Sequence, residues 1–161
     1  MRATDDGFEA GDGGVAIAAF EPAHVDAYRR LVTDTLREFG FEPDAAIDPD
    51  LDDPLEAYDA LWVALADGEV VGSIAVRDLG DDELELKRMY LRPELRGRGL
   101  GKRLLATALD YARESGAHVV KLDTSERMET ARHLYEAHGF VRVPGYAPRQ
   151  GQQRLLYELR F

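Results

Sequence analysis

The chain of 161 residues contains no cysteine and only four histidines. Without cysteine it can form no disulfide, no thiolate metal site and no cysteine nucleophile, a composition that suits a reducing compartment. No run of about 18 apolar residues occurs, and the N-terminus lacks the apolar core of a signal peptide. We therefore expect a cytoplasmic protein with neither a membrane span nor a metal centre.

Lysine is also scarce: three lysines accompany 17 arginines, against 31 aspartates and glutamates, and the formal net charge is −11. Such a charge repels nucleic acids and anionic lipids over the surface as a whole, so we expect no nucleic-acid partner and no membrane partner. Two explanations of this composition stay open. Dense carboxylates help to solvate proteins in a salt-adapted cytosol, an acidic proteome, whereas a GC-rich genome favours arginine codons over lysine codons.

The length predicts one domain. Residues 1–14 are rich in aspartate and glycine and are expected to form a flexible acidic tail, and residues 15–161 the folded domain. An apolar period of 3.6 residues predicts helices over 22–39, 100–115 and 127–138. Apolar runs between turn signals predict strands over 15–20, 61–67, 68–78, 83–91, 118–124, 140–143 and 154–161. This order predicts an α/β fold with a mixed sheet of six to seven strands and helices on both faces.

Residues 41–56 contain three prolines, seven acids and no cation, which predicts a loop or a broken helix. Two interpretations of the acids remain: they solvate the surface, or they attract a cationic amine. Asp48, Asp50 and Asp52 also match the first half of a calcium-binding loop, but Asp53 stands where that loop requires glycine. We therefore expect no metal there.

The opposite charge gathers in residues 87–103, which carry seven cations and one acid, so the rest of the chain has a formal charge of −17. Within this stretch a strand is followed by a turn with three glycines and then by a helix. Glycines let backbone N–H groups approach a ligand, and a helix N-terminus favours negative charge, so the pattern predicts an anion site. Arg103 replaces the serine or threonine of a P-loop, and Lys102 replaces the third glycine of a dinucleotide-binding loop, so neither motif is present.

The pattern R-x-x-G-x-G, from Arg96 to Gly101, resembles the pyrophosphate-binding motif of the GNAT superfamily of N-acetyltransferases. The strings ELKRMYLRPELRGRGLGKRLL and LDTSERMETARHLYEAHGF are similar to the family's central strand, turn and helix and to the following strand and helix. The resemblance implies acetyl-CoA as co-substrate. It also implies a strongly twisted sheet that splays open between the fourth and fifth strands, with CoA in the split.

By the same resemblance, the end of the central strand holds the acetyl and pantetheine groups, and the turn holds the phosphates. The cofactor-binding residues expected from it are Met89, Tyr90, Leu91, Arg96, Gly97, Arg98, Gly99, Leu100, Gly101 and Lys102. One departure is Met128, which stands where many relatives have an asparagine that contacts the cofactor. Thr124 or Ser125 could take over that contact, or the contact is lost.

Acetyl transfer to an amine requires a group that accepts a proton and a group that protonates the leaving thiolate. Glu85 lies at the position of the catalytic glutamate of several family members, although strand alternation also allows a solvated residue or a pair with Lys87, with Arg88 on the opposite face. Tyr135 matches the tyrosine that the family places beside the CoA sulfur. Its helical spacing alone fits a core aromatic residue.

The sequence therefore predicts an N-acetyltransferase that moves an acetyl group directly from acetyl-CoA to a primary amine of a small molecule or peptide. The alternative is a non-catalytic GNAT-like module that binds CoA or another phosphorylated ligand. A nucleic-acid binder that uses the cationic stretch is a third, weaker hypothesis. The identity of the amine and the oligomeric state stay open, and a homodimer is compatible with the sequence.

Overall fold

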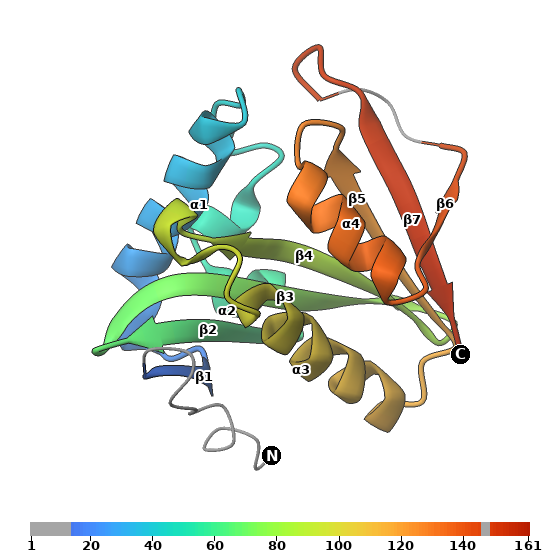
Figure 1. The fold of residues 1–161 in the computed structure, drawn as a ribbon, viewed down its shortest axis with the longest axis horizontal. Helices are drawn as coiled ribbons and strands as arrows, with labels where there is room; N and C mark the ends of the chain where they lie inside the picture. Colours follow the sequence, from blue (N-terminus) through green and yellow to red (C-terminus); the bar gives the residue numbers. More distant parts are fainter. Residues whose placement is uncertain (1–13, 146–148) are drawn as a thin grey trace.

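The computed structural model describes residues 14–145 and 149–161, so the predicted tail lies almost wholly outside the described residues. One seven-stranded sheet organises them, in the order β1-β2-β3-β4-β5-β7-β6 (Figure 1). Its strands are β1 (Val15–Ala19), β2 (Ala60–Ala66), β3 (Glu69–Gly80), β4 (Glu83–Leu91), β5 (Val119–Ser125), β6 (Val141–Val143) and β7 (Arg154–Arg160). All neighbouring strands pair antiparallel except β4 and β5, which are parallel. This mixed sheet confirms the predicted fold class.

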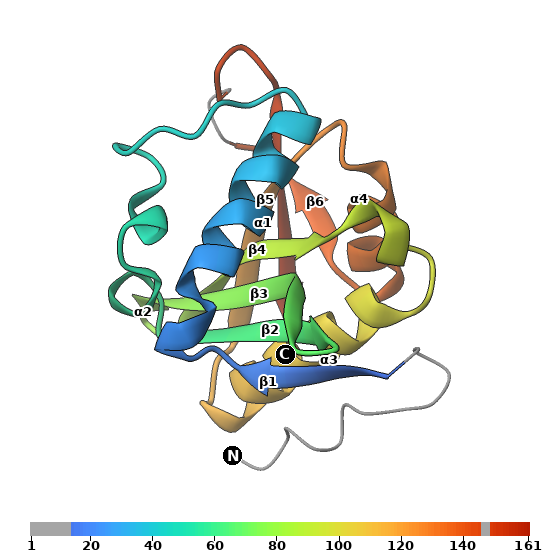
Figure 2. The same ribbon diagram turned by 90° about the vertical axis from the view of Figure 1, so that its left-hand side faces the viewer.

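Helices cover both faces of the sheet (Figure 2). They are η3 (Pro22–His24), α1 (Val25–Glu38), η4 (Pro49–Leu51), α2 (Pro54–Ala57), η5 (Pro93–Leu95), α3 (Leu100–Glu114) and α4 (Glu129–Ala137). One apolar core lies between the sheet and α1, and a second lies between the sheet and the helices α3 and α4. The short η4 and α2 confirm that residues 41–56 form a loop broken by single helical turns. No described helix has the length and apolar character needed to cross a lipid bilayer.

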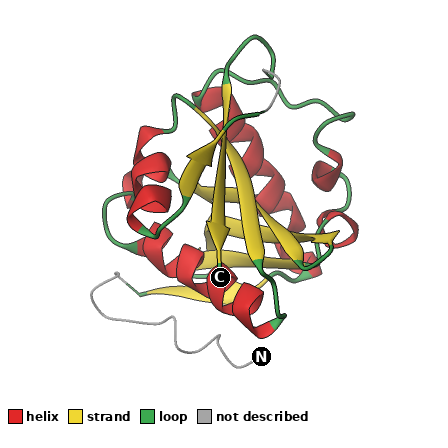
Figure 3. Cartoon of the chain, turned by 90° about the vertical axis from the view of Figure 1, so that its right-hand side faces the viewer, coloured by secondary structure: helices red, strands yellow, loops and turns green. Residues whose placement is uncertain are grey.

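The sheet opens where β4 and β5 separate. These strands pair only over Glu83–Glu85 and Val119–Lys121, although each continues beyond that point. Beyond these paired residues, the strands β5, β7 and β6 turn away from the first four strands. Figure 3 shows the two parts of the sheet at a steep angle to each other. The expected split between the fourth and fifth strands is thus confirmed, and it exposes the C-terminal half of β4.

A β-bulge bends β4 in that exposed half. Ser73 of β3 is opposite Tyr90 and Ala75 is opposite Lys87, so β4 has one residue more than β3 over this interval. The extra residue is accommodated at Arg88, whose backbone adopts a left-handed φ of +56°. Such a φ is rare outside glycine, and the Ser73 hydroxyl fixes it by donating to the Arg88 carbonyl at 2.7 Å.

Candidate active site

Two cavities lie in the split. The outer cavity, of about 610 Å³, is lined by the C-terminal end of α1, the end of β4, the glycine turn and α4. The inner cavity, of about 50 Å³, is lined by β4, β5 and β7, by Tyr135 of α4 and by residues of the loops. Met89, Tyr90 and Met128 line both cavities. The two spaces therefore meet at the bulge of β4.

The glycine turn forms one end of the outer cavity. Gly97 and Gly99 have φ values of +80° and +84°, and a Cβ atom at either position would meet no atom within 4 Å. Among the described residues, no acceptor is found for the backbone N–H groups of residues 97–102, which include the first turn of α3. Unpaired N–H groups at a helix N-terminus attract anions, so the turn has the geometry of a phosphate site.

The side chains of the predicted turn residues divide by role. Lys102 is exposed and lines the outer cavity, whereas Arg98 is exposed and is not among the residues that line it. The Leu100 side chain is fully buried in the core, so only its backbone can face a ligand. Gly101 packs against Leu134 of α4, where a Cβ atom would lie 3.3 Å from Leu134 Cδ2.

Arg96 fastens the turn to the rest of the protein. Its Nη1 and Nη2 donate to the two carboxylate oxygens of Glu38 at 2.6 and 2.8 Å, and its Nε and Nη2 donate to the Leu91 carbonyl. Its guanidinium also lies 5.6 Å from the centre of the Phe39 ring. These contacts occupy the guanidinium, so the arginine of the motif holds the loop against α1 and β4.

The bulge places Arg88 on the α1 side of the sheet. The strand alternation predicted it on the other face with Leu86, and that prediction is wrong because the extra residue inverts the alternation. Its Nε and Nη2 donate to the two oxygens of Asp50 at 2.9 and 2.8 Å, and Nη2 also donates to Asp48 at 2.8 Å. Tyr28 of α1 donates its hydroxyl to Asp50 at 2.6 Å.

These contacts also correct the interpretation of two of the seven acids in residues 41–56, while the other five are exposed. Asp48 and Asp50 are each 1% exposed, so they neither solvate the surface nor reach an amine in solution. Burial alone raises the pKa of Asp48, but hydrogen bonds from Arg149 and Arg88 outweigh it and lower the pKa below the usual value. For Asp50 the pairing with Arg88 likewise overcomes burial and lowers the pKa. The two acids are ionised partners of arginines.

Tyr135 is a buried residue of α4 that lines the inner cavity. Its ring packs against Phe140 and Tyr157. Its hydroxyl makes no hydrogen bond to another described residue, an uncommon state for a buried tyrosine. Burial, with the charge of Asp123, raises the pKa of Tyr135 well above its usual value. The side chain is thus a protonated hydroxyl beside the point where the cavities meet.

Comparison with known proteins agrees with this geometry. Residues 25–140 match the acetyltransferase (GNAT) family. The chain belongs to the GNAT family. It is 35% identical over 127 residues to the uncharacterised N-acetyltransferase YjgM of Escherichia coli, an alignment that covers 73% of this chain and 76% of that protein.

Solved structures share the fold. An acetyltransferase from Streptococcus agalactiae superposes with a TM-score of 0.81 at 25% identity, over 91% of this chain and 98% of the other. The Salmonella typhimurium protein yncA, whose structure contains its cofactor acetyl-CoA, superposes with a TM-score of 0.72 at 19% identity, over 91% and 93% of the two chains. The family and the fold expected from the central motif are both confirmed.

In this GNAT protein Glu85 lies on the α1 side of β4 and is 6% exposed. Its carboxylate accepts a hydrogen bond from Arg77 Nη2 at 2.6 Å, so its partner is neither solvent nor Lys87. Glu85 lines neither the inner nor the outer cavity. Glu85 therefore makes no direct contact with either cavity.

Met128 and its two expected substitutes have different surroundings. Met128 lines both cavities, and Thr124 donates its hydroxyl to Met128 Sδ at 3.6 Å while lining the inner cavity. Ser125 is fully buried, accepts from the backbone N–H of Arg127 and donates to Gln152. Ser125 therefore has a structural role, and Thr124 is the hydroxyl that faces the site.

The inner cavity contains charged residues that sequence reasoning missed. Asp123 of β5 accepts from Arg154 of β7 at 2.9 and 2.7 Å, and Lys87 Nζ lies 3.8 Å from Asp123 Oδ1. Arg154 comes from the last predicted strand, and only the antiparallel pairing of β5 with β7 brings it to this place. No local signal in the sequence indicates that contact.

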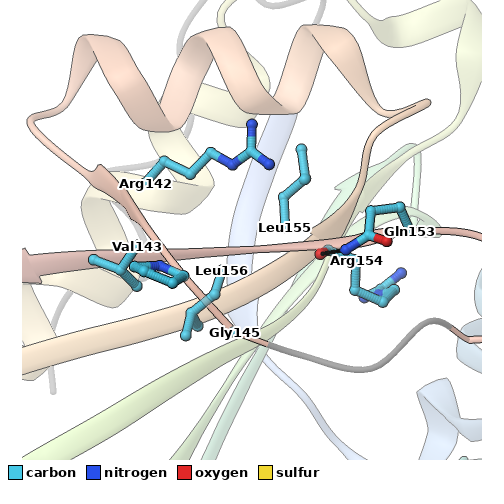
Figure 4. A pocket seen from close by; sticks show the side chains of 8 residues that line it. Arg142, Val143, Gly145, Gln153, Arg154, Leu155 and Leu156 are labelled. Atoms are coloured by element: carbon cyan, nitrogen blue, oxygen red, sulfur yellow. Dashed lines mark hydrogen bonds between the residues drawn. The ribbon is translucent and has the colours of Figure 1, made fainter.

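A third opening, of about 420 Å³, lies between β6 and β7, away from the glycine turn. Figure 4 shows Arg142 and Leu155 on one side of the β7 ribbon and Arg154 on the other. Arg154 lines this opening as well as the inner cavity, and its guanidinium donates to Asp123. Among the described residues, no group of three acids or histidines could hold a metal ion.

Proposed function

We propose that this GNAT protein transfers an acetyl group from acetyl-CoA directly to a primary amine of a small molecule or peptide. The observation that carries the proposal is the meeting of two cavities at Met89, Tyr90 and Met128. One cavity ends at a helix N-terminus whose N–H groups have no partner in the described part of the chain, which suits the phosphates of acetyl-CoA. The other gives the amine a separate approach to the same point.

The turn and the bulge divide the binding of acetyl-CoA between them. The backbone N–H groups of residues 97–102 bind its phosphates, and the Lys102 ammonium adds charge. Met89, Tyr90 and Leu91 hold the pantetheine and acetyl groups, and a backbone N–H of this segment stabilises the negative charge that develops on the acetyl oxygen. Leu100 contributes its N–H, and Arg96 acts by holding the turn in place.

In the reaction the amine nitrogen bonds to the acetyl carbon and the carbon–sulfur bond breaks. The nitrogen loses one proton, and the sulfur leaves with the electron pair of the broken bond and takes up one proton. Tyr135 donates that second proton, since its hydroxyl is protonated at neutral pH and unpaired among the described residues. Glu85 accepts the first proton through water. Direct attack requires no acyl-enzyme, and the chain has no cysteine to form one.

Release of free thiol from acetyl-CoA, measured against a panel of primary amines, tests the proposal. Tyr135→Phe should lower kcat about 100-fold, the lower range for general acid catalysis, and Glu85→Gln should lower it as well. Tyr157→Phe is the matched control, because this buried tyrosine donates to Glu136 and lines neither cavity. Full activity of Tyr135→Phe at every pH would show that Tyr135 is not the general acid. Absence of thiol release with every amine would remove the transfer reaction.

A further inference from the structure

The inner cavity is cationic, although the chain as a whole carries a formal charge of −11. Six charged side chains line it, four cationic and two acidic: Lys87, Arg88, Arg149, Arg154, Asp48 and Asp123. A third acid, Asp50, lies directly behind Arg88. The cavity wall therefore has one cation more than it has acids.

Two of the arginines are neutralised by nearby acids. Arg88 bonds both oxygens of Asp50, and Arg149 donates from Nη1 and Nη2 to the two oxygens of Asp48 at 3.0 and 2.8 Å. The Asp48 side chain is fully buried and the Asp50 side chain is 2% exposed. These two pairs form a neutral wall.

The excess charge lies at Lys87 and Arg154, which share one acid. Arg154 donates to Asp123 from Nε and Nη2, and its Nη1 takes no part in these hydrogen bonds. Lys87 Nζ is 3.8 Å from Asp123 Oδ1, a distance beyond a hydrogen bond. Both side chains are mostly buried, at 29% and 15% exposure. Among the described residues, the Lys87 ammonium and the Arg154 Nη1 group thus have no hydrogen-bond partner, and both side chains line this small, partly desolvated space.

On the basis of the proposed function, we propose that the acceptor is an amine that also carries a carboxylate, as α-amino acids do, and that Lys87 and Arg154 bind this carboxylate. A carboxylate supplies both the missing charge and the acceptor atoms for these donors. A diamine or polyamine brings a second cation to a wall that already has one in excess, so charge disfavours it. The substrate class therefore follows from the charge of the wall.

The position and the size of the inner cavity also suit an amino acid as the acceptor. Lys87 precedes Met89 by two residues, and Met89 lines both cavities, so an acceptor held at Lys87 needs only a short span to the bulge. The cavity of about 50 Å³ admits about four water-sized groups. That is close to the size of an ammonium, one carbon and a carboxylate, so a larger side chain of the acceptor must extend toward the opening.

The test compares each amino acid with its own amide, which has the same shape but no carboxylate. Thiol release from acetyl-CoA is measured for the natural amino acids, their amides and aliphatic diamines. At least one amino acid should exceed its amide in kcat/KM by about 10-fold or more, the effect of one charge-assisted hydrogen bond. Lys87→Gln should reduce this ratio about tenfold. Lys121→Gln is the matched control, because Lys121 has a similar exposure of 28%, pairs with Glu83 and lies outside the cavity.

Each outcome has one meaning. A preference for the amino acid that Lys87→Gln reduces and Lys121→Gln keeps supports the proposal. Amides or diamines that react as well as or better than every amino acid overturn the proposal but leave the transfer reaction intact. A preference that both lysine variants keep equally overturns the role of Lys87. If no amine of any charge releases thiol, the proposed function fails, and the proposal fails with it.

Discussion

Arg88 and Asp50 form a buried ion pair with two hydrogen bonds, Nε to Oδ2 at 2.9 Å and Nη2 to Oδ1 at 2.8 Å. The pair joins the bulge of β4 to η4, which is 38 residues earlier in the chain. The bulge orients Met89, which lines both cavities. Because the acidic segment holds the bulge through this ion pair, it supports the geometry of the site. Asp48 and Asp50 are the acids of this segment that bond Arg88, and they hold it at the bulge.

We expect Asp50→Asn to lower the free energy of unfolding by about 3–5 kcal/mol, the cost of breaking a buried ion pair by removing one partner. Among the described residues, Arg88 would then keep Asp48 as its one acidic partner, and Tyr28 would lose a charged acceptor. Urea unfolding measures the change. Asp52→Asn is the control, because that exposed acid lies two residues away and should change the free energy by less than about 0.5 kcal/mol. Equal effects of the two substitutions would contradict the importance of the pair.

The same acids predict how stability depends on pH. The pKa values of Asp48 and Asp50 are lower in the folded protein than the ordinary aspartate value of about 3.9. The folded state therefore binds fewer protons, and this part of the stability is present above about pH 4 and is lost as the pH falls toward the lower folded values. The urea midpoint should drop between about pH 4 and pH 2, and less steeply in the double variant Asp48→Asn/Asp50→Asn. An unchanged slope in that variant would assign the acid sensitivity to other carboxylates.

Much of the fold could be predicted because its signals are local. Asp67 and Gly68 both adopt positive φ, 50° and 79°, as the tight β2–β3 hairpin requires, and their sequence indicates that turn. Leu84 and Leu86 alternate into the core as expected. Arg88 breaks the rule because its position depends on Ser73, Asp48 and Asp50, and no pattern within β4 shows those contacts.

Of the candidate site, only the glycine-turn motif could be predicted from the sequence. The glycine turn is a local pattern, so the turn before α3 was predictable, whereas the partners of its arginine were not. The acidic segment seemed unpaired because its cations are distant: Arg88 is 40 residues from Asp48 and Arg149 is 101 residues from it. The separated strands β4, β5 and β7 likewise place Lys87, Asp123 and Arg154 together without a sequence signal.

Gly99→Ala separates ligand binding from backbone strain. Alanine at a φ of +84° costs about 1–2 kcal/mol of stability, and its methyl group also enters the cradle in which the phosphates are proposed to bind. Gly116→Ala is a matched control with the same φ of +84° and no atom within 4 Å of its Cβ, at the far end of α3. Both variants should lose similar stability in urea, but only Gly99→Ala should raise the KM for acetyl-CoA, by about tenfold. A similar KM in the two variants would argue against phosphate binding at this turn.

Arg96 and Glu38 provide a last test, of whether the arginine of the motif holds the turn or contacts phosphate. Glu38 receives two hydrogen bonds from Arg96, so either truncation releases the turn from α1. Arg96→Ala and Glu38→Ala should each raise the KM for acetyl-CoA about fivefold, and the double variant should not exceed Arg96→Ala, because residues in contact act non-additively. A steady-state double-mutant cycle measures this coupling. A large rise in Arg96→Ala with none in Glu38→Ala would instead assign Arg96 a direct contact with the phosphates, since an anion ligand needs the guanidinium and not its carboxylate partner.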